Sequence, residues 1–587
     1  MVAKAGVTKR RVSNVTPASA SNVPSMSLME DLFGDEFPEA FATSSGYAAR
    51  SSKRVTDLPA ELLAMICEHL SNLDIKRLRL AGKHLAKNVG LRIDRIYISP
   101  NRANLDCLQR ILDHPRYRND VGEIVWDDAQ LEEYPTLDSF RHAIGIDEVK
   151  TTIDIENRLD EAIRGHEDDS PEYRALERDD FFSSNGQLTE VGKGILLRYD
   201  DQFSRDIIAR STTVMSIEQS YNLYQRLYQE EQEIMEQQLD VAALHRAIAG
   251  FPKMKRITLT SEVWRPWKLY PLYDTPFYRS LPPGFRKPSV WPWLGFRQQA
   301  TSVQAAHRDE VMSTRNIERL SIEFRGYSII VSTLLAIPNP KIEEIIIDAG
   351  NEYTGISHQL FASPNSDFEA TVRMFQLVPL KGLQLVINPY CSDSNPDSLF
   401  ASGLLKRALA EAQFLEHFDF NPHWLPRTYR HETLDLSFGP NEVLPEATIK
   451  RLTTFALRNV SVKENDLEDL LKEMENVEHV TLDNIHLKNS AFLHHQPDPS
   501  WVQLFHRLQS YYAASPMVSH PRFAWIEPTY YGRNYFVDEE IGDFLYRGAE
   551  CPFENGLQRP LKEGVGWFVD ERDKGFKVRR LVGVEGW

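Results

Sequence analysis

A recurring cassette, in which a helix is followed after a few residues by a short apolar strand, constrains the fold of this chain most. The cassettes recur irregularly, at spacings of roughly 23 to 40 residues, which is typical of a stacked array of helix–strand repeats interrupted by insertions. We therefore predict an α/β solenoid. Strands are expected near Ile96 and Ile98, at Glu123–Asp128, near Ile257, at Arg319–Phe324, Ile345–Ile347, Gly382–Asn388, Phe414–Phe420 and Leu452–Val460, and near Val480 and Leu482.

Two insertions are expected, near residues 129–250 and 263–296. The first begins with an acidic, irregular stretch and continues into a long helix with few breakers. The second contains Trp264, Trp267, Trp291 and Trp293. Proline stiffens this loop, and the large aromatic rings offer contact area at low entropic cost, so it is a possible substrate-binding loop. The alternative is a long connection that folds back and buries its own aromatic side chains.

Composition excludes several classes of protein. The net charge of −17 disfavours nucleic-acid binding through phosphate contacts, and no run of about 18 apolar residues predicts a membrane span. The N-terminus lacks the apolar core of a secretory signal. The four cysteines are scattered without a CxxC pair, which favours a reducing compartment. We expect an intracellular protein, in the cytoplasm or the nucleus.

The sequence contains no complete motif for phosphate binding, metal binding or catalysis. Gly186–Gly194 departs from the phosphate-binding loop in spacing and is interpreted as a glycine-containing turn, and the histidines between His479 and His506 lack a metal-binding spacing. No GxSxG elbow is present, and in a chain with 84 acidic residues neighbouring carboxylates such as Asp127–Asp128 are expected by chance. We expect no cofactor, no metal and no catalytic residue. An enzyme hidden in the repeat region remains an alternative.

The stretch after residue 55 predicts two short helices that are unusually apolar. Pro59 fits a first helical turn, and Leu62, Ile66 and Leu70 follow at spacings of four residues, on one face of the helix. Leu63 and Met65 widen the apolar stripe. About forty residues cannot bury this much apolar surface by themselves, so one face is expected to pack internally and another to await a partner.

The segment LPAELLAMICEHLSNLDIKRLRLAGKHLAK resembles the F-box motif. Its position ahead of degenerate cassettes is similar to the large F-box family of the fungal type. The resemblance implies an α/β chain: a small helical F-box followed by an irregular leucine-rich-repeat-like solenoid with long insertions. The domains would be a disordered tail at 1–54, the F-box at 55–95, the repeat-like domain at 96–515 and a C-terminal cap segment at 516–587.

F-box proteins are substrate-recognition adaptors of cullin–RING ubiquitin ligases, so the resemblance implies three partners: a Skp-type adaptor, a cullin scaffold and an unknown protein substrate. It also implies that the chain itself is not an enzyme. Alternatives are a scaffold that binds only the Skp-type subunit, a repeat-based protein-interaction module, and an ordinary helical hairpin that caps the repeats. The resemblance assigns docking contacts to Leu58, Pro59, Leu62, Ile66 and Leu70. It assigns Leu78 and Leu80 to supporting the F-box or extending its docking surface.

Overall fold

The computed structural model describes about three fifths of the chain, and the predicted tail at 1–54 lies outside the described part. By contact density the chain divides into Met1–Leu63 and Ala64–Trp587, with the boundary inside one helix. The described residues are 58–70, 72–145, 178–181, 188–197, 208, 215–260, 273, 275–288, 325–348, 355–388, 398–422, 437–488, 499–515, 520–528, 534–536, 538–552, 568–569 and 577–578.

The described chain begins with three short helices, α2 (Ala60–Glu68), α3 (Asn72–Leu80) and α4 (Lys83–Asn88). We call residues 58–90 the first helical segment. Leu63, Ile75, Leu85 and Val89 are its buried apolar side chains, and they belong to neither of the two large core clusters of the protein. Arg79 ties the end of α3 to the end of α4, because its guanidinium donates to the carbonyl of Val89.

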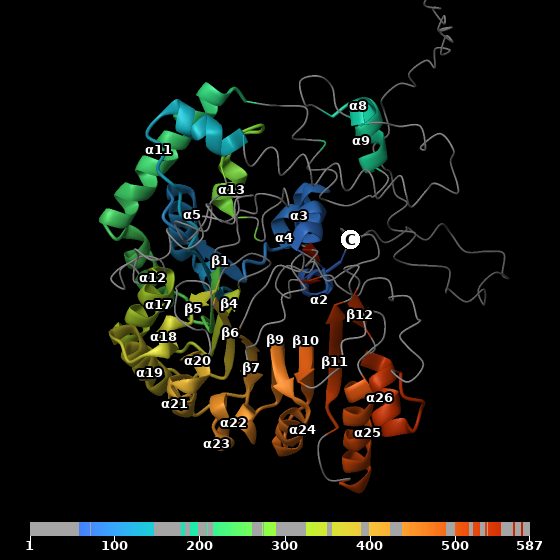
Figure 1. The fold of residues 1–587 in the computed structure, drawn as a ribbon. Coiled ribbons are helices and arrows are strands. Elements are labelled where there is room, and N and C mark those ends of the chain that lie inside the picture. The colour runs from blue at the N-terminus through green and yellow to red at the C-terminus, as the bar shows by residue number, and fades with distance from the viewer. Residues whose placement is uncertain are drawn as a thin grey trace, which may run out of the picture. The chain divides into compact units, whose positions relative to one another are not determined.

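The rest is a mixed α/β structure built on a twelve-stranded open sheet (Figure 1). Nine strands of its main path are parallel, and each pairs with the strand of the next cassette. The edge strand β12 pairs antiparallel with the last of them. Short β5 (Ile356–Ser357) and β8 (Ser437–Phe438) pair alongside, and β13 (Phe568–Val569) pairs with β14 (Lys577–Val578) separately. The strands of the main path are β1 (Arg95–Ile98), β2 (Glu123–Asp127), β3 (Arg256–Thr260), β4 (Glu344–Asp348), β6 (Gly382–Asn388), β7 (His417–Asn421), β9 (Thr454–Lys463), β10 (His479–Lys488), β11 (Arg522–Pro528) and β12 (Asn534–Phe536).

Helices line one face of this sheet, and each contacts the next in chain order (Figure 1). This row consists of α5 (Arg102–Asp113), α12 (Leu239–Gly250), α17 (Arg325–Ala336), α19 (Ser366–Leu377), α21 (Leu404–Glu411), α22 (Pro440–Val443), α24 (Glu464–Glu473), α25 (Pro499–Ala514) and α26 (Asp538–Arg547). The other described helices are α6 (Pro115–Arg118), α8 (Arg178–Phe181), α9 (Glu190–Leu197), α11 (Ile217–Glu236), α13 (Pro276–Ser280), α18 (Gln359–Ala362), α20 (Ser398–Ala401) and α23 (Glu446–Ile449). No described helix is long and apolar enough to cross a membrane.

The strand register shows that the cassettes share one apolar spacing, with apolar residues two positions before the strand and at its second and fourth positions. Because strand side chains alternate between faces, the latter two both point at the helices. The pattern holds for Ile93/Ile96/Ile98, Val121/Ile124/Trp126, Met254/Ile257/Leu259, Ile342/Ile345/Ile347, Leu380/Leu383/Leu385, Leu415/Phe418/Phe420, Leu452/Phe455/Leu457 and Val477/Val480/Leu482. Each fully buried side chain contributes about 1.5–3 kcal/mol.

The backbone repeats as regularly as the side chains. Before β6, the amides of Lys381 and Gly382 both donate to the carbonyl of Glu343, and before β7 the amides of Glu416 and His417 both donate to Lys381. The same paired bond precedes every strand from β2 to β10 on the main path. Each cassette is therefore anchored to the one before it at the same point.

Most predicted strands agree with the structure. Gly382–Asn388 is β6, and the strand predicted at Phe414–Phe420 begins three residues later, as β7. The strand predicted at Arg319–Phe324 lies outside the described residues. Arg522–Pro528, inside the predicted cap segment, pairs in parallel with β10, so this part of the segment continues the sheet. The interpretation of Gly186–Gly194 as a turn is wrong for Gly192 and Gly194, which are helical within α9.

The two insertions supply a second core, on the opposite face of the sheet. Val125 points away from Ile124 and Trp126 and packs with Phe140 and with Tyr224 of α11. From the second insertion, Tyr273 and Phe277 are buried in the same cluster. The amide of Phe277 donates to the buried side chain of Asn104 at 2.9 Å. Strand β2 is consequently buried along its whole length.

Candidate protein-interaction surfaces

None of the seven predicted docking residues is buried. Pro59, Leu62, Ile66 and Leu80 are exposed, and Leu58, Leu70 and Leu78 are partly exposed. They come from α2, α3 and the residues that flank α2.

The first helical segment concentrates exposed apolar side chains. Among the described residues, eight large apolar side chains are exposed, and four of them belong to this segment. Met65 is 60% exposed and Leu80 86%, while Leu62 and Ile66, one turn apart on α2, are each more than 40% exposed. Met65 is not among the predicted docking residues, although its place in the apolar stripe of the sequence is a signal for it. Exposed apolar residues that cluster in this way are typical of a partner surface.

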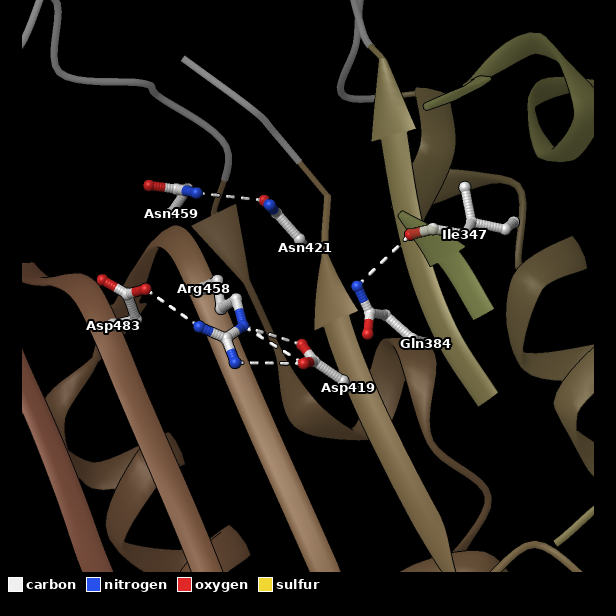
Figure 2. A network of polar contacts seen from close by, with 7 residues as sticks. All are labelled: Ile347, Gln384, Asp419, Asn421, Arg458, Asn459 and Asp483. Atoms are coloured by element: carbon white, nitrogen blue, oxygen red, sulfur yellow. Dashed lines mark hydrogen bonds and ion pairs between the residues drawn. The ribbon is translucent and has the colours of Figure 1, made fainter. Parts of the chain in front are cut away.

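A second surface is the sheet face opposite the helices, where Arg458 of β9 binds carboxylates on both neighbouring strands (Figure 2). Its Nε donates to Asp419 Oδ1 at 2.9 Å and its Nη2 to Asp419 Oδ2 at 3.1 Å, while Nη1 donates to Asp483 Oδ2 at 2.9 Å. Bidentate pairs of this kind are among the strong charge-assisted hydrogen bonds. All three side chains remain partly accessible to solvent.

This network contains two carboxylates and one guanidinium, so its net charge is negative. Burial acts to lower the pKa of Arg458, but Asp419 and Asp483 more than offset it, so the pKa is raised and the guanidinium stays charged. Around it, Asn459 donates to Asn421 at 3.2 Å and Gln384 to the carbonyl of Ile347 at 3.3 Å (Figure 2). The sequence alone does not reveal this network, because cross-strand pairing depends on register. Its only signal in the sequence is the presence of acidic and basic residues within successive strands.

A group of buried acids lies at the other end of the sheet, where the chain leaves β2. Burial raises the pKa of Asp127 to about 8, of Asp128 to about 7 and of Glu231 to about 8. Asp127 accepts from the amide of Ala129 at 3.1 Å, and Glu231 of α11 accepts from Leu131 at 2.8 Å. Asp127 therefore caps the turn that leaves β2, and Glu231 holds the start of the first insertion to α11.

One buried ion pair stands beside these acids. Asp240 of α12 is fully buried and binds Arg325 of α17 through two hydrogen bonds, of 2.6 and 3.0 Å. The Asp128 carboxylate accepts from the indole of Trp126 at 3.1 Å, and the Arg325 guanidinium lies 5.9 Å from the Trp126 ring. Carboxylates in this region are paired or hydrogen-bonded, as burial requires.

The remaining predicted sites are only partly visible. Trp264, Trp267, Trp291 and Trp293 of the possible substrate-binding loop lie outside the described residues. In the described part of the chain, no group of three or more His, Cys, Asp or Glu is arranged to hold a metal ion. Burial raises the pKa of the Cys67 and Cys107 thiols.

Comparison with protein-family models finds no match, and comparison with curated proteins finds no similar sequence.

Proposed function

We propose that this chain is the substrate-recognition adaptor of an SCF-type cullin–RING ubiquitin ligase. In this proposal the first helical segment is an F-box that docks a Skp-type subunit. The sheet domain is an irregular leucine-rich-repeat-like array that presents a protein substrate. The chain needs no catalytic residue for this, because holding a substrate near a charged conjugating enzyme raises the effective concentration of its lysines.

The observation that carries the proposal is the accessibility of the docking residues. A hairpin that merely capped the repeats would bury Leu62, Ile66 and Leu80, but all three are exposed. Leu63, Ile75 and Leu85 are buried instead, so the segment keeps an internal apolar face and an external one. An external face of this kind supports a stable dock, for which an interface of about 1,600 Å² is typical.

The repeat part of the proposal is supported by the shared spacing of the cassettes. Apolar-x-x-apolar-x-apolar corresponds to the first six positions of the leucine-rich-repeat consensus, with isoleucine, valine, phenylalanine, methionine and tryptophan often replacing leucine. Successive parallel strands with helices on one face are what stacked helix–strand repeats produce. The partly open face that carries Arg458 is then the natural place for substrate contacts.

Co-expression with a Skp-type subunit and the N-terminal region of a cullin, followed by pull-down, tests the proposal. We expect wild type to retain both partners and the Leu62→Asp/Ile66→Asp variant to lose both. The matched control is Leu377→Asp/Phe414→Asp, which alters two exposed apolar residues of the sheet domain and should retain both partners. If wild type holds the Skp-type subunit without the cullin, the chain is a scaffold outside the ligase. If folded wild type holds neither, the F-box assignment is wrong.

A further inference from the structure

A groove with a cavity volume of about 460 Å³, lined by both apolar and charged side chains, lies at the amino-terminal ends of the strands, the edge of the sheet where helices lead into strands. It is formed by the connections α12–β3, α17–β4 and α19–β6, which are adjacent because their strands pair in that order. This volume is in the range of known ligand sites. We call this site the edge groove.

The edge groove is stiff before anything binds. Each of its three connections contributes one proline, namely Pro252, Pro340 and Pro379. Proline fixes its own backbone angle, and each connection is also held by the paired amide bonds that precede every strand. Asn339 adds a residue in the left-handed region, with φ of 50°. A preformed groove loses less conformational freedom on binding than a mobile one.

The rim of the groove combines an apolar anchor point with positive charge. Leu377, the last residue of α19, is 57% exposed. Lys255 and Lys381 share a single carboxylate, that of Glu343, at 3.0 and 3.4 Å. Lys341 is exposed and has no ion pair among the described residues. Three lysines thus face one glutamate, in a chain whose net charge is −17.

The sign of the charge changes farther along the same edge. The corresponding connections before β7 and β10 carry Glu416 and Glu478 in the positions that Lys255 and Lys381 occupy before β3 and β6. Phe414, in the connection before β7, is exposed to the same degree as Leu377 but has acidic neighbours. The edge groove therefore sets positive charge beside an exposed apolar residue, unlike the connections before β7 and β10, and this combination favours negatively charged partners.

We propose that the edge groove binds an acidic peptide segment that carries bulky apolar side chains, supplied by the protein substrate. Its identification with a substrate rests on the proposed adaptor function. An apolar side chain of the segment packs against Leu377 and the prolines, and its carboxylates face Lys341 and the two lysines that share Glu343. The apolar contact gives most of the affinity, and the charges give orientation and rate.

Fluorescence anisotropy with a labelled hexapeptide, Asp-Glu-Leu-Phe-Asp-Glu, tests the proposal on the full chain. The control peptide keeps Leu-Phe and replaces the four acids by lysine. We expect saturable binding of the acidic peptide only, weakened by salt. Leu377→Asp should weaken binding by about tenfold or more, and Lys341→Glu by a few fold together with a smaller salt dependence. Phe414→Asp is the matched control and should bind like wild type.

Three results would overturn the proposal: no saturable binding of the acidic peptide, equal binding of the lysine peptide, or binding that Leu377→Asp leaves unchanged. Circular dichroism spectra of the variants establish that they are folded. Because no Skp-type subunit takes part, failure here is distinguishable from failure of the adaptor function. A chain that binds the peptide but pulls down neither ligase partner keeps the groove and loses only its link to a ligase.

Discussion

The first helical segment and the sheet domain use the same apolar residues with opposite results. In the sheet domain, Leu385, Phe420 and Leu457 stand on neighbouring strands, and each is at most 2% exposed. In the helical segment, Leu62 of α2 is 45% exposed. Each cassette of the sheet is covered by the next one, whereas a helix of nine residues with apolar side chains around most of its circumference cannot cover itself. The comparison teaches that apolar content alone does not locate a core.

The largest effect is expected from truncating the apolar ladder. Phe455 of β9 is fully buried and stands beside Phe418 of β7 and Val480 of β10. Phe455→Ala should lower the free energy of unfolding by about 3–5 kcal/mol, because the transfer energy is lost and a cavity remains. Urea unfolding measures it. Phe414→Ala, at an exposed site, should change it by less than about 0.5 kcal/mol, and equal losses for the two would break the comparison.

Breaking an ion pair should lower the free energy of unfolding much more in the sheet domain than in the helical segment. Asp240→Ala leaves the Arg325 guanidinium without its buried partner and should cost about 3 kcal/mol. In the helical segment, Asp74 and Arg77 of α3 lie 3.3 Å apart with both side chains largely exposed. Asp74→Ala should therefore cost less than about 1 kcal/mol. Thermal unfolding of both variants beside wild type gives the two values, and a larger loss for Asp74→Ala would contradict the account.

A rise in pH from 5 to 8 should destabilise the sheet domain. Burial raises the pKa of Asp127 and Glu231 to about 8 in the folded protein, so the folded state holds protons that the unfolded state releases near pH 4. The free energy of unfolding should then fall between pH 5 and pH 8, by about 1.4 kcal/mol per pH unit for each such proton. Urea titrations across this range measure the slope.

A neutral isostere isolates one of these acids. Glu231→Gln keeps an oxygen that can accept from the amide of Leu131 but carries no proton to lose, so it should make the pH slope shallower. A variant with the wild-type slope would show that the pKa of Glu231 is not raised.

The smallest effect on stability is expected at Leu80. Leu80→Ser removes an exposed side chain and should change the free energy of unfolding by less than about 0.5 kcal/mol. Leu85, five residues later in α4, is buried, and Leu85→Ala should cost about 2 kcal/mol or more. Chemical denaturation of this pair separates the outer apolar face of the segment from its inner one. A marked loss for Leu80→Ser would place Leu80 in a core.

The sequence predicted the cassettes well, because apolar spacing is local information. The strand at Gly382–Asn388 appears as predicted. The sequence could not predict what depends on register and long-range packing. Arg458 meets Asp419 and Asp483 only because three strands align, and Glu231 meets the amide of Leu131 across 100 residues of chain. Replacement of leucine by other apolar residues also hid the regularity of the cassettes.

The central claim is that the exposed face of the first helical segment docks a Skp-type subunit, and calorimetric titration of purified chain with that subunit tests it most directly. If Leu62 and Ile66 each contribute about 2 kcal/mol to binding, Leu62→Asp/Ile66→Asp should raise the dissociation constant roughly a thousandfold. The Leu377→Asp/Phe414→Asp control should bind like wild type. A folded Leu62→Asp/Ile66→Asp variant that binds as tightly as wild type would contradict the account.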